Sequence, residues 1–350
     1  MDTISLANFK KEVEQIRQYI QHIEYVDSVI KHITMKRGML ALGLYKLKTH
    51  TKKHDRSKKK VEYKAIIISL YGLLERYIEI WVKDYLNAIS SLAPYNELPN
   101  KIKVSHFKLS TKLISMLIEE RWDKYDFLSK EEVLKNLYNC TENQPNYKLN
   151  AEAFTTQSGN LKHNKIALIF DNLDIKLNDK LIENEALNQI TGIDTKRISG
   201  TKKDLLYFII NDIVDRRNRT AHGAEIDDLL DNPTLITYID FLEKYCQAIF
   251  EVLMQEYLRL ESTHKFQQIE VVHKVWEKST LGFEIERYTV SQGDMLIIET
   301  TEGRFYKKPI LELQKENVQY ASLSITDKTN IAIRVEPPIN NKCKFYIERK

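Results

Sequence analysis

The stretch AIIISLYGLLERYIEIWV at residues 65–82 decides the fold class, because it is apolar on nearly every face of a helix. Such a pattern is typical of a helix at the centre of an α-helical domain, and we predict a buried helix over residues 61–89. Glu75 and Arg76 interrupt the apolar run, so we expect no membrane span. The start MDTISLANFKKEVEQI has no basic region leading into an apolar core, so we expect no export signal. Glu75 and Glu79 lie one turn apart, and each buried carboxylate has to reach the surface or pair with a cation.

Helical spacing of apolar residues predicts further helices on both sides of this one. Amphipathic helices are expected over residues 5–33, with Ser5 as N-cap, and over residues 202–219. Asn232 and Pro233 are typical of an N-cap and a first-turn proline, and they predict a helix to near residue 260. Weaker patterns indicate shorter helices over residues 107–122, 130–139 and 162–172.

The net charge of +4 on 350 residues is unevenly distributed. Residues 1–60 hold about 14 Lys and Arg against about 6 acids, so the rest of the chain is slightly acidic. The stretch KLKTHTKKHDRSKKK at residues 46–60 has too little apolar material to pack, and we expect an exposed basic loop. Two interpretations stay open for this loop: a solvated connection, or a contact with nucleic-acid phosphates.

After about residue 263 the sequence changes to short β-branched and aromatic runs separated by turns such as TEGR at residues 301–304. This pattern predicts a small antiparallel β barrel or sandwich, so the fold class is α+β. The three cysteines are far apart and show no paired spacing, which favours neither disulfides nor a cysteine metal site and fits a reducing cytoplasm. We expect three regions: an N-terminal amphipathic helix with the basic loop, a helical domain, and a β domain, at residues 1–60, 61–263 and 266–350.

A second stretch, VDRRNRTAHGA at residues 214–224, carries the chemistry. Histidine exchanges protons near neutrality, and arginine can hold two phosphoryl oxygens at once. These residue types suit metal-independent RNA cleavage, because RNA supplies its own 2′-hydroxyl nucleophile. Five positions turn an ideal helix by about 500°, so Arg217 and His222 can face one phosphate only if the chain leaves the helix at residues 221–223.

The spacing of Arg217 and His222 is unspecific by itself, since Arg17 with His22 and Arg259 with His264 repeat it. Those two pairs are explained by an amphipathic surface and by a cationic helix end. Around His222 the residues after Arg217 are small or hydrogen-bonding, which leaves room for a ligand, and Gly223 follows.

The segment RNRTAHG at residues 217–223 resembles the ribonuclease motif of the HEPN superfamily, a group of all-helical proteins. The segment QSGNLKHNKIALIF at residues 157–170 is similar to a helix entry in its RiboL-PSP branch. The resemblance covers residues 60–262 and implies a HEPN-like ribonuclease bundle that acts on RNA. It also implies a homodimer with a composite active site, a role in antiviral defence or a toxin-antitoxin system, and a protein inhibitor or trigger.

Within the motif, Arg217 is expected to stabilise the phosphorane and His222 to act as general base or acid. The neighbouring guanidinium groups lower the pKa of His222 while the helix end raises it, so the sequence does not choose between the two roles. Asn218 either bonds the substrate or is an ordinary polar surface residue. The remaining polar residues are expected to contact RNA phosphates or, for the arginines, to pair with acids such as Asp215 or the candidate supporting carboxylate Glu75; they are Arg216, Arg219 and Thr220.

No metal or cofactor is implied, because the chain contains neither a phosphate-binding glycine loop nor a zinc-protease motif. Two other functions stay open. The site around Arg217 and His222 could hold RNA or a nucleotide without cleaving it, or the chain could be an adaptor that acts through its β domain.

Overall fold

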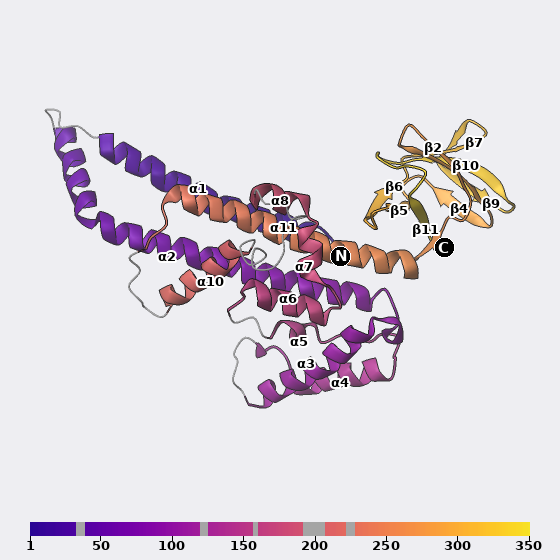
Figure 1. The fold of residues 1–350 in the computed structure, drawn as a ribbon, viewed down its shortest axis with the longest axis horizontal. Helices are drawn as coiled ribbons and strands as arrows, with labels where there is room; N and C mark the ends of the chain where they lie inside the picture. Colours follow the sequence, from indigo (N-terminus) through magenta and orange to yellow (C-terminus); the bar gives the residue numbers. More distant parts are fainter. Residues whose placement is uncertain (33–38, 120–124, 157–159, 192–206, 222–227) are drawn as a thin grey trace.

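The computed structural model describes residues 1–32, 39–119, 125–156, 160–191, 207–221 and 228–350. A helical body occupies most of the chain and a β domain follows at its carboxyl end (Figure 1). The main helices are α1 (Ile4–His32), α2 (Met39–Ser90), α3 (Asn100–Ile118), α4 (Lys130–Thr141), α6 (His163–Asn172), α10 (Phe208–Ala221) and α11 (Asn232–His264). Shorter helices are η1 (Tyr95–Glu97), α5 (Ala151–Thr155), α7 (Leu177–Ile182) and α8 (Glu185–Thr191).

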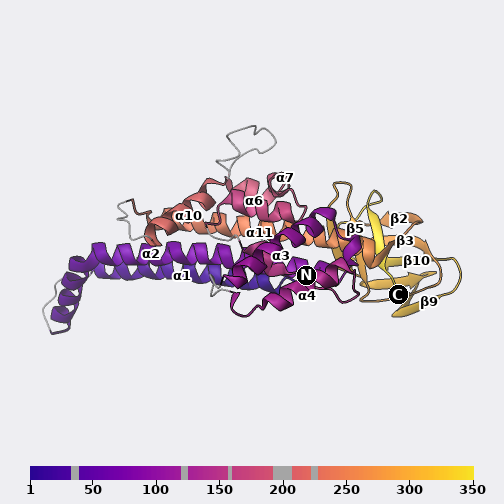
Figure 2. The same ribbon diagram turned by 90° about the horizontal axis from the view of Figure 1, so that it is seen from below.

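The prediction of an exposed basic loop at residues 46–60 is wrong, because this segment is part of the 52-residue helix α2. Lys and Arg are good helix formers, and no glycine or proline occurs between Gly43 and Gly72. The segment needs little packing of its own because it continues a helix that is buried further along. Lys58 Nζ reaches Asp27 of α1 at 2.6 Å, so the two helices are linked there. Together α1 and α2 extend from the body as a long arm (Figures 1 and 2).

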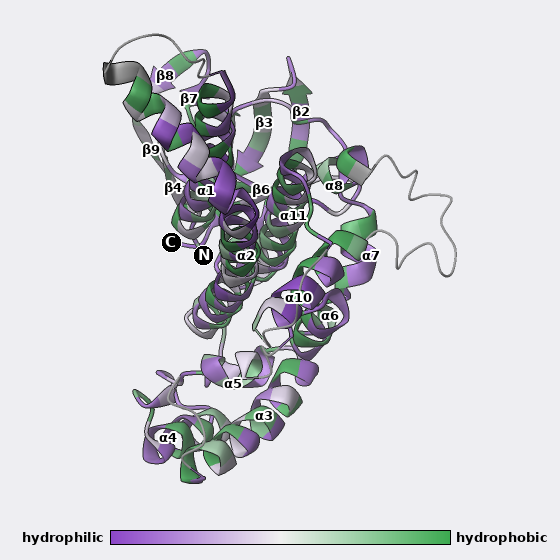
Figure 3. Ribbon diagram, turned by 90° about the vertical axis from the view of Figure 1, so that its left-hand side faces the viewer, coloured by the Kyte–Doolittle hydropathy of each residue, from purple (hydrophilic) through white to green (hydrophobic). Residues whose placement is uncertain are grey.

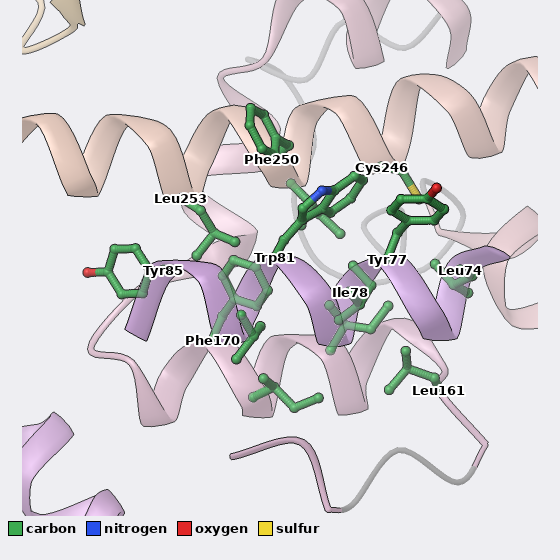
Figure 4. Close-up of a cluster of buried hydrophobic side chains, with 14 of the residues drawn as sticks. Leu74, Tyr77, Ile78, Trp81, Tyr85, Leu161, Phe170, Cys246, Phe250 and Leu253 are labelled. Atoms are coloured by element: carbon green, nitrogen blue, oxygen red, sulfur yellow. The ribbon is translucent and has the colours of Figure 1, made fainter. Parts of the chain in front are cut away.

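The core of the helical body lies between the second half of α2 and the long helix α11, which confirms the predicted buried helix. Both helices carry many hydrophobic residues at the centre of the molecule (Figure 3). Trp81 points from α2 toward α11, where its ring lies 5.5 Å from that of Phe250, centre to centre (Figure 4). The Phe9 ring of α1 is also 5.5 Å from Trp81. Three helices that are distant in sequence are therefore joined through one indole ring.

The start of α11 differs from the prediction by one residue. Asp231, rather than Asn232, is the N-cap, and its carboxylate accepts a hydrogen bond from the Thr234 backbone N–H at 3.0 Å. Pro233 lies in the first turn, as predicted. The helices predicted at residues 5–33, 107–122, 130–139 and 162–172 correspond to α1, α3, α4 and α6.

The β domain is built from antiparallel pairs, as predicted. Its described strands form a four-stranded sheet in the order β1-β11-β5-β6, a five-stranded sheet in the order β2-β3-β10-β7-β8, and the pair β4-β9. No sheet closes on itself among these strands, so a sandwich fits better than a barrel. The strands are β1 (Phe266–Gln268), β2 (Val272–Trp276), β3 (Thr280–Ile285), β4 (Tyr288–Ser291), β5 (Met295–Glu299), β6 (Phe305–Pro309), β7 (Glu312–Lys315), β8 (Val318–Tyr320), β9 (Ser322–Ile325), β10 (Thr329–Arg334) and β11 (Lys344–Glu348).

The β domain is attached to the last turns of α11 by specific contacts. Leu258 of α11 packs with Phe266, Ile297 and Phe305 in a small apolar cluster of its own. The side-chain NH2 of Gln255 donates to the Phe305 carbonyl at 2.8 Å. The side-chain oxygen of Gln255 accepts a hydrogen bond from the Phe305 N–H at 2.7 Å. These contacts fix the β domain against the end of the helical body that lies away from the arm (Figure 2).

Candidate functional site

Helix α10 carries the arginine-rich half of the motif and lies against α2 and α11. It buries Ile210, Ile213 and Val214 on the side facing these helices. The same packing distributes the three motif arginines differently, because consecutive positions on a helix point about 100° apart. Arg216 is buried, Arg217 is half-buried and Arg219 is exposed.

Arg216 is engaged by protein groups on every side and is only 6% exposed. Its Nε donates to Asp212 at 2.5 Å, and one terminal nitrogen donates to the hydroxyl of Tyr63 at 2.8 Å. The other terminal nitrogen contacts the Asp228 carboxylate at 3.1 Å. Burial alone would lower the pKa of Arg216, but the bonds with Asp212 and Tyr63 outweigh it and hold that pKa above its ordinary value.

The predicted pairing of Arg216 with Asp215 or Glu75 is therefore not what the structure shows. Asp215 lies on the exposed side of α10 and pairs with Lys162 at 2.7 Å. Because its guanidinium is occupied by Asp212, Tyr63 and Asp228, Arg216 has little surface left for an RNA phosphate. Its role in this structure is to hold α10 against α2 and the segment before α11.

Arg217 has a different environment. Its guanidinium carbon lies 4.5 Å from the centre of the Tyr71 ring of α2, a cation–π geometry. One of its terminal nitrogens donates to the side-chain oxygen of Asn218 at 3.1 Å. Among the residues that the structure describes, no salt bridge involves Arg217. The cation is thus oriented by a ring and an amide, neither of which neutralises it.

Tyr71 joins the two segments that carry the family resemblance. Its hydroxyl accepts a hydrogen bond from the Leu161 backbone N–H at 3.4 Å, just before α6, while its ring supports Arg217. Burial, followed by the charge of Glu75 one turn along α2, raises the pKa of Tyr71. Glu75 is thus near Tyr71, and its role as a supporting carboxylate stays a prediction. The sequence offers no specific signal for Tyr71, because Tyr63, Tyr77 and Tyr85 are also buried tyrosines of α2.

The remaining motif residues are placed as follows. Arg219 is exposed near the end of α10, and the Thr220 hydroxyl donates to the Arg216 carbonyl within the helix at 2.9 Å. The structure describes α10 to Ala221, so His222, Gly223 and the predicted departure from the helix lie outside the described residues. The distance between Arg217 and His222 therefore remains a prediction.

In the other two Arg–His pairs with the same spacing, the arginine forms salt bridges with acidic residues. Arg17 contacts Glu14, Asp240 and Glu243, which ties α1 to α11, while His22 is exposed. Arg259 pairs with Glu256 at 2.9 Å, and His264 lies 3.4 Å from Glu97. Neither of these arginines rests on an aromatic ring in the way that Arg217 does among the described residues.

In the part of the chain that the structure describes, no group of three or more His, Cys, Asp or Glu is arranged to hold a metal ion. The same part of the chain contains no helix long and apolar enough to cross a membrane.

Comparison with known proteins places these features in a family. The chain matches the family model RiboL-PSP-HEPN over residues 43–255, and no curated protein matches it. The match includes most of α2, all of α10 and most of α11, so it contains Tyr71, Arg217 and Asn218. Because this range is more than half of the 350 residues, the chain belongs to the RiboL-PSP-HEPN family.

Proposed function

We propose that this protein is a metal-independent endoribonuclease. The observation that carries the proposal is the state of Arg217: a half-buried cation, oriented by Tyr71 and Asn218 and without a carboxylate partner among the described residues. A permanently charged, preorganised guanidinium is suited to the equatorial oxygens of a phosphorane, since its orientation does not have to be created during the reaction. The family match supports an RNA-related nuclease function.

The proposed reaction needs two proton transfers, one from the attacking 2′-hydroxyl and one to the leaving 5′-oxygen. The substrate 2′-oxygen loses its proton and attacks phosphorus, the bond to the 5′-oxygen breaks, and that oxygen takes a proton as it leaves. The products are a 2′,3′-cyclic phosphate and a 5′-hydroxyl. His222 performs one of these transfers, and Arg217 stabilises the charge on the phosphoryl oxygens between them.

Two protomers would supply two copies of His222, one for each proton transfer, which is why we also propose a homodimer with a composite site. Asn218 orients Arg217 in this scheme, and exposed Arg219 contacts a flanking phosphate, while the Thr220 hydroxyl donates within the helix. Since uncontrolled RNA cleavage is toxic to a cell, the proposed setting is antiviral defence or a toxin-antitoxin system, with a protein inhibitor or trigger.

The test is cleavage of mixed RNAs by the purified protein in EDTA. We expect the wild type to yield fragments with 5′-hydroxyl ends, and His222→Ala and Arg217→Ala to yield none. The matched control is His22→Ala, because His22 also follows an arginine by five positions but lies exposed on α1. Cleavage by His222→Ala at the wild-type rate, or loss of cleavage in His22→Ala, would contradict the assignment.

The same experiment separates cleavage from binding alone. A protein that retains RNA or a nucleotide without producing 5′-hydroxyl ends would be a binding or adaptor protein. The β domain is the region through which an adaptor would act, so full function after removal of residues 266–350 would argue against that alternative.

A further inference from the structure

One face of α2 carries a row of lysines that leads along the arm to Tyr71. At about 100° per residue, four lysines and Tyr71 fall within about 40° of one another around the helix. They are Lys46, Lys53, Lys60, Lys64 and Tyr71, and we call the four lysines the basic stripe. The stripe exists as a row along one face of α2 only because residues 46–60 are helical; in a loop these lysines would share no face.

The basic stripe presents charge of one sign. Lys46 and Lys53 are exposed, Lys64 is half-buried, and none of the salt bridges among the described residues involves these three. The acids of the same segment, Asp55 and Glu62, lie on the other side of α2, about 140° or more from the stripe. There Asp55 pairs with Lys59 and Glu62 with Lys58, so neither acid neutralises the stripe.

The direction and length of the stripe indicate its ligand. At about 1.5 Å per residue, Lys46 lies about 37 Å along the helix from Tyr71, on which Arg217 rests. A row of cations that ends at a candidate phosphate-binding arginine matches a linear polyanion. With phosphates on the order of 3.4 Å apart in a stacked strand, the row corresponds to roughly 11 nucleotides.

A lipid surface fits the arm less well. A helix that lies on a membrane needs one continuous apolar face opposite its charges. The exposed apolar residues at the end of the arm instead point in scattered directions around α2; they are Leu42, Leu44, Tyr45 and Leu47.

We propose that the basic stripe of α2 binds the backbone of single-stranded RNA and guides it to Arg217. This inference rests on the proposed function, because it takes RNA to be the substrate. It adds that recognition extends over the whole arm, is independent of base sequence, and requires an RNA longer than the site itself.

The test measures RNA binding in the full-length His222→Ala protein, so that the substrate stays intact. Lys46→Gln/Lys53→Gln/Lys64→Gln should weaken binding of an RNA of about 20 nucleotides at least about tenfold. It should also lower the slope of log Kd against log salt by about 2, at about 0.7 for each lost phosphate contact. Binding of an RNA of about 4 nucleotides should weaken much less, because from Arg217 such an RNA can reach Lys64 but neither Lys53 nor Lys46.

Two matched controls introduce the same change of charge at positions outside the stripe. Lys108→Gln/Lys112→Gln/Lys135→Gln removes three exposed lysines from α3 and α4, and it should leave both RNAs bound as before. Lys53→Glu should weaken binding of the longer RNA more than Lys52→Glu, although the two residues are adjacent and both exposed.

Equal losses of RNA binding in the stripe variant and the α3–α4 control would overturn the proposal, because such losses would reflect the net charge of the protein alone. Unchanged RNA binding would also overturn it, as would loss of binding only to vesicles that contain phosphatidylserine. If the stripe controls RNA binding and the wild type never cleaves RNA, the proposed nuclease function fails while the stripe stands.

Discussion

The guanidinium carbon of Arg217 lies 4.5 Å from the centre of the Tyr71 ring, and this contact joins the last turns of α10 to the middle of α2. Arg216, the preceding residue, is held instead by Asp212, Tyr63 and Asp228. Adjacent arginines thus have separate tasks: one fixes the helix, and the other presents a charge. The distinction follows from the 100° step between them, which turns Arg216 toward Asp212 and Asp228 and Arg217 toward an aromatic ring.

Replacing Tyr71 should affect cleavage according to what remains of its ring. Tyr71→Phe keeps the ring beneath Arg217 and loses the hydroxyl that accepts the Leu161 N–H, so we expect cleavage within about threefold of wild type. Tyr71→Leu keeps a smaller apolar side chain without a π face, and loss of a cation–π contact of about 0.5 to 2 kcal/mol predicts a cleavage rate lower by about 2- to 30-fold. Single-turnover rates with one RNA measure both. A Phe variant slower than the Leu variant would show that the hydroxyl, rather than the ring, is the functional group.

Arg216 and Arg217 should differ in whether their loss reduces stability or activity. Arg216→Met leaves the half-buried Asp212 without its cation and should lower the free energy of unfolding by about 1.5 to 3 kcal/mol. Arg217→Met should change that free energy by less than about 1 kcal/mol while reducing cleavage by about 10² to 10³. Urea unfolding and RNA cleavage, measured on both variants, separate the two effects. The assignment fails if Arg217→Met unfolds like Arg216→Met, because Arg217 would then be structural.

The residue types of the site were predictable from the sequence, but their division of tasks was not. Local spacing indicates that Arg216, Arg217 and Arg219 occupy different sides of a helix. It does not indicate which side faces Tyr63 or Tyr71, because both tyrosines lie about 150 residues away in the chain and meet α10 only through tertiary packing. Asp215 was one of the acids considered as a partner for Arg216 and Arg219, but it pairs with Lys162 instead.

The fold was predicted correctly where apolar residues repeat at helical spacing, and wrongly where they do not. Residues 61–89 and α11 have apolar faces that only a buried helix explains, and both predictions were confirmed. Residues 46–60 have no such face, and their helical structure comes from continuity with the buried half of α2 and from the helix propensity of Lys and Arg. Absence of an apolar face therefore indicates exposure, and it does not by itself indicate a loop.

Attachment of the β domain should depend on Gln255. Its side chain bonds both the N–H and the carbonyl of Phe305, so Gln255→Leu leaves two backbone groups without their partner at a half-buried junction. We expect the free energy of unfolding to fall by about 2 kcal/mol. Gln267→Leu, an equivalent change at an exposed position of β1, should alter it by less than about 0.5 kcal/mol. Equal unfolding midpoints for the two variants would mean that the Gln255 bonds do not stabilise the junction.

Stability should fall in acid because of the buried His106 on α3. Its Nε2 accepts a hydrogen bond from the Asn150 backbone N–H at 3.0 Å, which requires the neutral ring, and burial lowers the pKa of His106 to about 4. Since the unfolded chain binds this proton near pH 6.5 and the folded chain does not, the contribution to stability is present above pH 6.5 and declines as the pH falls toward 4. We expect a loss of about 2 kcal/mol between pH 7 and pH 5 from this residue.

His106→Gln isolates this contribution, because glutamine does not titrate and its side-chain oxygen can accept the Asn150 N–H. The variant should be less stable than the wild type at pH 7, but its free energy of unfolding in urea should change less between pH 7 and pH 5. The control His22→Gln alters an exposed histidine and should retain the wild-type pH dependence. If His106→Gln lost as much stability in acid as the wild type, the acid sensitivity would have to come from other groups, and a charged His106 would be tolerated within the α3 packing.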